Sequence, residues 1–281
     1  MTSGLLNIDL VSQVDNSQRY IARSDTAMME NLKEEKDLKS FDPDWYIQNL
    51  LASDEAAFNM RCDVEILHRF FNEHNVSGKR LLDVGTGPTI HTLITAYNHV
   101  DEIYLSDYLP QNLQYLEKWL EGEINQPTKL IDYVMSLEKR TMTARQRETE
   151  IRSKVKGILP VDVTKSKPLG DTYNDTQFDI IISSYCIETA VFTVEEYGKC
   201  LENVASLLKK GGYLILFVCL NGDNYQIGEY KYRALSITRE ELQSTMRQVG
   251  FDIVAAEEVA ESEYDAKYLG FDSCYYMLAR K

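Results

Sequence analysis

The sequence predicts an α/β protein built on a doubly wound, mostly parallel sheet. Short apolar runs that suit buried strands alternate with segments of helical periodicity along most of the 281 residues. The first run ends in Gly85-Thr86-Gly87, where two glycines let a buried strand turn sharply and bring a ligand against the backbone. Asp107 ends the next run, 20 residues beyond Gly87, and therefore lies at the same carboxyl edge of the sheet.

The individual elements follow from periodicity and from helix start and stop signals. We expect strands over residues 80–84, 102–107, 156–163, 178–184, 213–220, 251–257 and 273–279. We expect helices over residues 58–71, 89–98 and 194–209, and two more that begin at Pro110 and Thr238. The last two strands should pair antiparallel, because the chain between them is too aperiodic for a crossover helix.

The domain organisation is simple. Residues 1–40 are polar and are expected to form an N-terminal arm, and residues 41–281 are expected to form a single domain. Within this domain the charged segment 129–156 interrupts the alternation of strands and helices. Its helical periodicity is weak and its charges are mixed in sign, so we expect a surface insertion.

Composition and charge narrow the partners. The formal net charge of −14 argues against a nucleic-acid or anionic-membrane partner, since both attract basic patches, and it suits a small amine-bearing molecule. Five cysteines are scattered without the spacing of a zinc site or a disulfide frame, so we expect reduced thiols, no bound metal and a cytoplasmic protein. The sequence predicts neither a signal peptide nor a transmembrane span.

The glycine turn favours a nucleoside ligand that has no pyrophosphate. Asp107 can accept both hydroxyls of a ribose, and Asp83 stands two residues before the first glycine. In the dinucleotide pattern G-x-G-x-x-G the third glycine lets a pyrophosphate sit on the helix start, but here that position is Ile90, and Pro88 removes an amide donor. S-adenosylmethionine therefore suits this turn better than NAD, and an NAD-dependent oxidoreductase stays open as the alternative.

Five segments are the most specific in the chain: LLDVGTGPTI, LSDYLPQNLQYLEKWL, PVDVTKSKPLG, IGEYKY and the terminal LARK. They resemble the small-molecule amine N-methyltransferases that include the nicotinamide, phenylethanolamine and indolethylamine enzymes. The resemblance covers residues 41–281 and implies a Rossmann-like seven-stranded, mostly parallel sheet with an antiparallel last strand and helices on both faces. It also implies S-adenosylmethionine-dependent methylation of a small amine, and we expect the enzyme to act as a monomer.

The resemblance also implies which residues bind the cofactor. Asp107 would bind the ribose, Asp162 and Val163 would flank the adenine, and Ser184 would lie near the methionine part. Asp162 could instead serve only to cap a turn. In full, the implied contacts are Tyr46, Gly85, Gly87, Thr89, His91, Asp107, Tyr108, Asn112, Asp162, Val163 and Ser184.

The acceptor side needs residues that position an amine and handle its proton. Glu188 and Tyr225 lie on expected loops after strand ends, and the Tyr225 ring can stack on an aromatic amine. Tyr46 matches a tyrosine that closes over cofactor and acceptor in the family. We take Tyr46, Tyr225 and Glu188 as the catalytic candidates. Further loop candidates are Asp223, Tyr264 and Asp265.

Three departures from the family pattern bear on the acceptor. Leu50 and Leu51 stand where several relatives have paired tyrosines, and His91 replaces a common tyrosine. Val218 stands where the nicotinamide enzymes hold the carboxamide with an aspartate. Nicotinamide recognition is therefore not expected, and a catalytically silent relative of the enzymes stays open as a further alternative.

Overall fold

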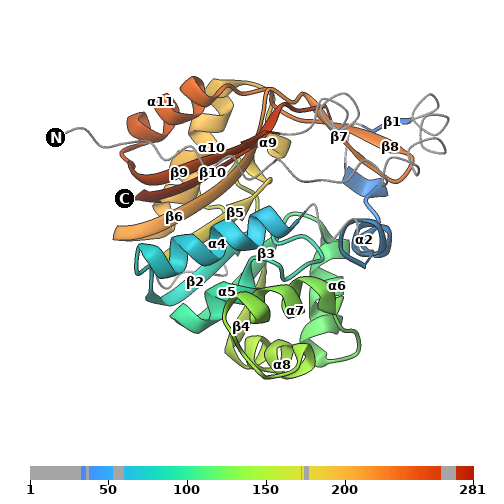
Figure 1. Ribbon diagram of the computed structural model, residues 1–281. Coiled ribbons are helices and arrows are strands. Elements are labelled where there is room, and N and C mark those ends of the chain that lie inside the picture. The colour runs from blue at the N-terminus through green and yellow to red at the C-terminus, as the bar shows by residue number, and fades with distance from the viewer. Residues whose placement is uncertain (1–32, 36–37, 53–59, 172, 174–176, 261–269) are drawn as a thin grey trace.

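The structure, a computed structural model, describes residues 33–35, 38–52, 60–171, 173, 177–260 and 270–281. Seven strands form the main sheet (Figure 1). In spatial order they are β4 (Val155–Pro160), β3 (Val100–Asp107), β2 (Gly78–Val84), β5 (Phe178–Ser184), β6 (Leu208–Leu220), β10 (Ser273–Arg280) and β9 (Asp252–Ala260). The first five strands of this order, from β4 to β6, are parallel to their neighbours, whereas β10 is antiparallel to both β6 and β9. The predicted sheet, with its antiparallel last strand, is confirmed.

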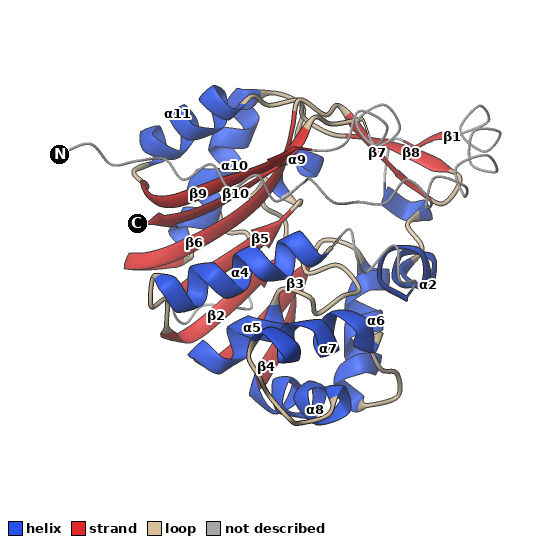
Figure 2. Cartoon of the chain, in the orientation of Figure 1, coloured by secondary structure: helices blue, strands red, loops and turns tan. Residues whose placement is uncertain are grey.

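Helices cover both faces of this sheet (Figure 2). The first face carries α4 (Arg61–Glu73), α5 (Leu93–Ala96), α6 (Pro110–Glu121), α7 (Thr128–Leu137) and α8 (Ala144–Lys154). The opposite face carries α9 (Ile187–Ala190), α10 (Val194–Ser206) and α11 (Arg239–Val249). Leu81 packs in the first layer and Leu82 in the second, both fully buried. Burial on both faces explains why β2 reads as a continuous apolar run.

The expectation of a surface insertion over residues 129–156 is wrong. Helices α7 and α8 fill most of this segment, and their inner faces join the core beside β4. Arg147 and Glu148 of α8 are fully buried. Glu148 accepts hydrogen bonds from the Trp119 indole at 2.7 Å and from the Gln126 backbone N–H at 2.8 Å. Arg147 and Glu148 are therefore internal groups, and Glu148 is an internal hydrogen-bond acceptor rather than part of a solvated segment.

The helix expected over residues 89–98 is shorter than predicted. Helix α5 contains only four residues and is followed by a 3₁₀ turn over Tyr97–His99. The Thr89 hydroxyl accepts a hydrogen bond from the His91 backbone N–H at 3.0 Å, and the Thr92 hydroxyl donates to a carboxylate of β2 at 2.6 Å. Local side-chain bonds of this kind compete with helix formation.

A second, three-stranded sheet was not expected from the sequence. It consists of β1 (Lys33–Glu35), β8 (Tyr230–Arg233) and β7 (Asn224–Ile227), so Tyr225 lies on a strand rather than on a loop. Helix α2 (Pro43–Ile47) begins at the expected Asp-Pro signal, where Asp42 accepts bonds from two backbone N–H groups. Figure 1 shows α2 and this sheet at the right, beyond one end of the main sheet.

Two of the expected elements include residues that lie outside the described part of the chain. Most of the arm expected over residues 1–40 lies outside the described residues, and so does Phe58, so that α4 is described from Arg61. Among the helices that are described, none combines the length and the apolar character needed to cross a membrane.

Candidate active site

The glycine turn after β2 has the strained backbone that its sequence requires. Gly85 and Gly87 have φ values of +75° and +65°, a region that favours glycine. A Cβ atom at Gly85 would also collide with the Cys186 side chain. The backbone N–H groups of Gly85 and Thr86 both donate to the Ser106 carbonyl at 2.9 Å, which ties the turn to β3.

Asp107 is held at the tip of β3 by three donors. Its carboxylate accepts hydrogen bonds from the Gly87 N–H at 2.7 Å, the Leu109 N–H at 2.8 Å and the Asn112 side-chain amide at 3.1 Å. Only 5% of its surface is exposed, and this burial raises its pKa, while the backbone donors oppose the shift. The sequence therefore brings together Gly87, Asp107 and Asn112 as expected.

Thr89 and His91 form the next part of the turn. The Thr89 hydroxyl lies 2.9 Å from His91 Nδ1. Burial lowers the pKa of His91 to about 4, so its imidazole is neutral at physiological pH. Beneath the turn, burial raises the pKa of Asp83 to about 7, although the hydrogen bond from Thr92 opposes this shift. The turn thus presents neutral polar groups rather than cations that would suit a phosphate.

Three buried polar atoms at this edge have no hydrogen-bond partner among the described residues: His91 Nε2, Asn112 Oδ1 and Ser184 Oγ. Buried polar atoms in proteins are almost always hydrogen-bonded, so such atoms fit a polar ligand. The ribose hydroxyls and the amino-acid part of S-adenosylmethionine offer both donors and acceptors. The chemistry of these residues therefore fits that cofactor.

The segment after β4 carries the residues expected to flank the adenine. The Val161 N–H donates to the Asp107 carbonyl at 3.0 Å, which joins this segment to the ribose side. Asp162 accepts bonds from the backbone N–H and the hydroxyl of Thr164 at 3.0 and 2.5 Å, so it does cap a turn. Val163 is buried, whereas Tyr108 exposes 64% of its surface next to Asp107.

Glu188 lies on α9, directly after β5, and Tyr225 lies on β7. Glu188 is 3% exposed and accepts a hydrogen bond from the Cys219 backbone N–H at 3.3 Å. Burial raises the pKa of Glu188 to about 7. The Tyr225 ring stacks on Tyr232 with centroids 5.4 Å apart, and burial is the main cause of the raised pKa of Tyr225, with a smaller contribution from Glu188. A carboxyl group that can titrate near neutral pH is typical of a catalytic position.

Asp63 forms a polar cluster that the sequence analysis missed. Its Oδ1 atom accepts hydrogen bonds from the Tyr185 hydroxyl at 2.9 Å and from the Tyr276 hydroxyl at 2.8 Å. Tyr185 follows β5 with a φ of +51°, an uncommon conformation for a bulky residue, and such strain is frequent at functional sites. The only sequence signal was an acid on the apolar face of α4.

Tyr46 links the two sides of the site. Burial raises its pKa, and the charges of Asp63, Cys219 and Asp107 add to that shift. The Asp107 carboxylate on the ribose side and the Asp63 carboxylate therefore both act electrostatically on the Tyr46 hydroxyl. Its ring lies 5.6 Å from the Phe41 ring, at the start of α2.

The remaining candidates lie outside this arrangement. Asp223 is exposed and accepts a hydrogen bond from its neighbour Asn224. Val218 is 1% exposed within the core layer beneath α10 and α11, on the sheet face opposite to Phe217. Tyr264 and Asp265 lie outside the described residues.

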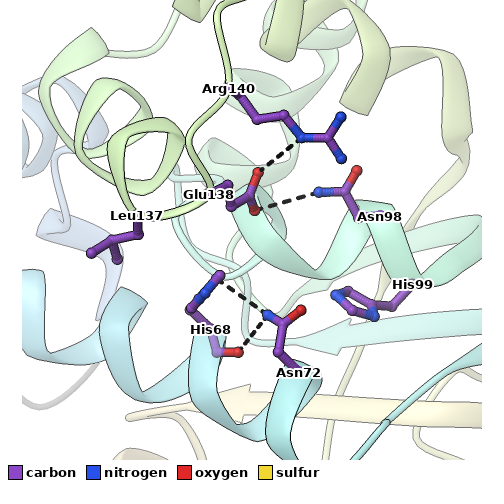
Figure 3. A pocket seen from close by; sticks show the side chains of 7 residues that line it. All are labelled: His68, Asn72, Asn98, His99, Leu137, Glu138 and Arg140. Carbon is purple, nitrogen blue, oxygen red and sulfur yellow. Dashed lines mark hydrogen bonds and ion pairs between the residues drawn. The ribbon is translucent and has the colours of Figure 1, made fainter.

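A polar hollow of about 290 Å³ lies away from these residues (Figure 3). It is lined by His68, Asn72, Asn98, His99, Leu137, Glu138 and Arg140. Asn98 and His99 precede β3, whereas Asp107 ends it, and an eight-residue strand spans roughly 25 Å. The hollow therefore does not belong to the site around Asp107.

Solved structures with a similar fold are methyltransferases. Magnesium protoporphyrin IX methyltransferase from Synechocystis PCC 6803, solved with bound SAH, gives a TM-score of 0.52 at 13% identity and covers 85% of this chain and 93% of its own. The N-methyltransferase NodS from Bradyrhizobium japonicum WM9 gives 0.51 at 11% identity, with 82% and 99% covered. Such similarity concerns the fold. The chain therefore has the Rossmann-like fold of these methyltransferases.

The chain belongs to the NNMT/PNMT/TEMT family, whose model matches residues 29–281. Nicotinamide N-methyltransferase of Homo sapiens is 35% identical over 76% of this chain and 81% of its own length. Indolethylamine N-methyltransferase of Mus musculus is 30% identical over 79% and 84%, and phenylethanolamine N-methyltransferase of Macaca mulatta is 27% identical over 76% and 78%. The predicted family and enzyme class are confirmed. Neither an NAD-dependent oxidoreductase nor a silent relative is supported.

Proposed function

We propose that this N-methyltransferase acts on a small basic amine, with Glu188 as the group that takes up the proton of the amine. The observation that carries this proposal is the buried Glu188 carboxyl, which accepts a hydrogen bond from the Cys219 N–H and whose pKa burial raises to about 7. A basic amine is largely protonated at neutral pH, and a protonated nitrogen has no lone pair with which to attack. A carboxylate with a pKa near 7 can remove that proton.

For the cofactor we propose the contacts that the family resemblance implies. Asp107 would bind the ribose hydroxyls, Asp162 and Val163 would flank the adenine, and Ser184 would lie near the methionine part. The full set is Tyr46, Gly85, Gly87, Thr89, His91, Asp107, Tyr108, Asn112, Asp162, Val163 and Ser184. Its support is the clustering of these residues at one edge of the sheet.

The chemistry divides between cofactor and protein. When bound, S-adenosylmethionine supplies an electrophilic methyl group on a sulfonium centre. The protein orients the acceptor and excludes water. We propose that the Tyr225 ring stacks on the acceptor and that Tyr46 closes over the acceptor and the cofactor. Glu188 takes up the proton of the amine. Asp63 would position the strained Tyr185, which directly follows β5 and precedes Glu188 by three residues.

Nicotinamide is expected to be a poor substrate, although relatives are named for it. Val218 is apolar and buried, so it offers no partner to a carboxamide. A buried amide without its partner costs about 1 to 3 kcal/mol, which is roughly tenfold to a hundredfold in specificity. We expect a higher kcat/KM for arylethylamines than for nicotinamide. The kcat/KM values of the wild type for nicotinamide and for arylethylamines test this expectation, and nicotinamide as the best substrate would overturn it.

We also propose that the enzyme acts as a monomer in the cytoplasm on a small molecule and not on nucleic acid. All five cysteines are present as thiols. The large hydrophobic side chains that are exposed among the described residues come from four separate segments: Tyr108, Leu137, Phe192 and Val254. Scattered apolar residues of this kind give little basis for a subunit interface.

The proposal is tested by methyl transfer from radiolabelled S-adenosylmethionine to a panel of amines, with calorimetry of cofactor binding alongside. We expect S-adenosylhomocysteine to bind and NAD not to bind, and at least one small basic amine to be methylated. Tighter binding of NAD, or methylation confined to acceptors without a basic nitrogen, would contradict the proposal.

A further inference from the structure

Two cysteines that are far apart in the sequence lie directly opposite each other in the sheet. Cys219 of β6 pairs with Cys274 of the antiparallel strand β10. The neighbouring pair on the same face, Phe217 and Tyr276, has ring centroids only 4.8 Å apart. The Cys274 thiol and burial together raise the pKa of Cys219 well above its usual value, so the pair rests as two thiols.

The backbone shows which type of antiparallel pair this is. The Phe217 carbonyl accepts from the Tyr185 N–H at 2.8 Å, and the Cys219 N–H donates to Glu188, so both residues direct their backbone groups toward the β5 side. The Leu220 carbonyl instead accepts from the Asp272 N–H at 3.0 Å, next to β10. Cys219 and Cys274 therefore form a pair without mutual hydrogen bonds, in which Cα atoms are about 4.5 Å apart.

This spacing is compatible with a disulfide, for which Cα–Cα distances of about 4.4 to 6.8 Å are usual. Cys219 is half-buried and Cys274 is 8% exposed, so an oxidant would reach Cys219 first. The pair also borders the acceptor side, because the Cys219 backbone N–H donates a hydrogen bond to Glu188. The scattered cysteines of the sequence thus include one pair that the fold brings together.

We propose that Cys219 and Cys274 form a reversible dithiol–disulfide site that reacts with small-molecule disulfides such as glutathione disulfide. The Cys219 thiolate attacks one sulfur of glutathione disulfide and releases one glutathione as a thiol. Cys274, after losing its proton, then attacks the Cys219 sulfur of the mixed disulfide and releases the second glutathione. The protein loses two protons and two electrons, and glutathione disulfide gains them.

The site itself is tested on the full-length protein, without reference to its activity. The protein is incubated with glutathione disulfide, alkylated and digested, and cross-linked peptides are identified by mass spectrometry. We expect a Cys219–Cys274 cross-link that dithiothreitol reverses, present in wild type and in Cys200→Ser, and absent from Cys219→Ser and Cys274→Ser. Cys200 is the matched control because it is buried on α10, away from the pair. Stable glutathione adducts on Cys219 without this cross-link would overturn the proposal.

A second measurement tests the link to the acceptor side and rests on the proposed function. Oxidation fixes Cys219, whose N–H binds Glu188, so we expect a severalfold loss of kcat/KM for the amine and unchanged affinity for S-adenosylhomocysteine. Dithiothreitol should restore the activity, and the oxidant should cause no further loss in Cys219→Ser, which lacks the attacking thiol. A cross-linked enzyme with unaltered kcat/KM would contradict the link while the disulfide site itself would stand.

Discussion

The two sides of the site are built in different ways. On the cofactor side, Asp107 and the turn over residues 85–87 are held largely by backbone donors from neighbouring segments. On the acceptor side, buried carboxyls from α4 and α9 are held by groups from distant strands, as when Asp63 binds Tyr276, 213 residues away. On the acceptor side Glu188 is buried with a pKa raised to about 7, and the rings of Tyr225 and Tyr232 stack on each other.

This difference separates the requirements of binding from those of chemistry. A site built from backbone groups recognises a cofactor that is the same for every S-adenosylmethionine-dependent methyltransferase of this fold. Such a site depends little on the side chains in the rest of the protein. A cradle built from side chains can change with the acceptor. We therefore expect substitutions on one side to leave the function of the other side largely intact.

The largest effect is expected for Glu188→Gln. General-base catalysis is typically worth about 100-fold to 10,000-fold, so kcat/KM for the amine should fall by roughly 100-fold or more above pH 7. The wild-type enzyme should gain activity as pH rises through about 7, because Glu188 becomes ionised there, and the variant should lack that gain. Glu195→Gln, an exposed acid on α10, is the matched control. Equal pH profiles for all three proteins would refute the assignment.

Glu188 should also leave a signature in stability. Its pKa of about 7 in the folded state is above its usual 4.5, so between these pH values the unfolded chain ionises while the folded protein keeps the proton. The free energy of unfolding should therefore decrease as pH rises from 4.5 to 7, by about 3 kcal/mol at most. Urea unfolding should show a smaller decrease in Glu188→Gln. Asp83 contributes in the same direction in both proteins, and its effect cancels in the comparison.

On the cofactor side, Asp107→Ala should weaken the binding of S-adenosylhomocysteine by about 2 to 3 kcal/mol, because it removes charge-assisted hydrogen bonds to the ribose. Calorimetry measures this directly. Asp101→Ala, at the exposed start of the same strand, provides the control. A folded Asp107→Ala protein, checked by circular dichroism, that binds with wild-type affinity would show that the ribose lies elsewhere.

The cofactor side could be predicted from the sequence to a large extent, whereas the acceptor side could not. The motif that contains Gly85, Gly87 and Asp107 is local, because consecutive parallel strands bring their ends to one edge. Asp63 escaped notice because its partners Tyr185 and Tyr276 are distant in the chain, and no periodicity reports such a contact.

The same limit explains the error over residues 129–156. Arg147 and Glu148 look solvated in the sequence, since charged residues are rarely buried. Their burial depends on partners such as the Trp119 indole and the Glu138 carboxylate, which only the fold supplies. The strands were predicted well because burial on both faces leaves a continuous apolar run in the sequence.

The smallest effect is expected for Tyr276→Phe, which removes one of the two phenol donors to Asp63. The free energy of unfolding should fall by about 1 to 3 kcal/mol, measured in urea, while the affinity for S-adenosylhomocysteine stays unchanged. Tyr213→Phe, on the neighbouring strand, is the control, because no hydrogen bond of its hydroxyl is found among the described residues. A cofactor affinity that fell together with stability would show that the two sides are not independent.

The independence of the two sides is tested most directly by the affinity of Glu188→Gln for S-adenosylhomocysteine, measured by calorimetry from pH 6 to pH 8 beside the wild type. Both proteins should have the same Kd at every pH in this range, even though only the wild type gains catalytic activity as Glu188 ionises. A Kd that follows the ionisation of Glu188 in the wild type and loses this dependence in the variant would contradict the account.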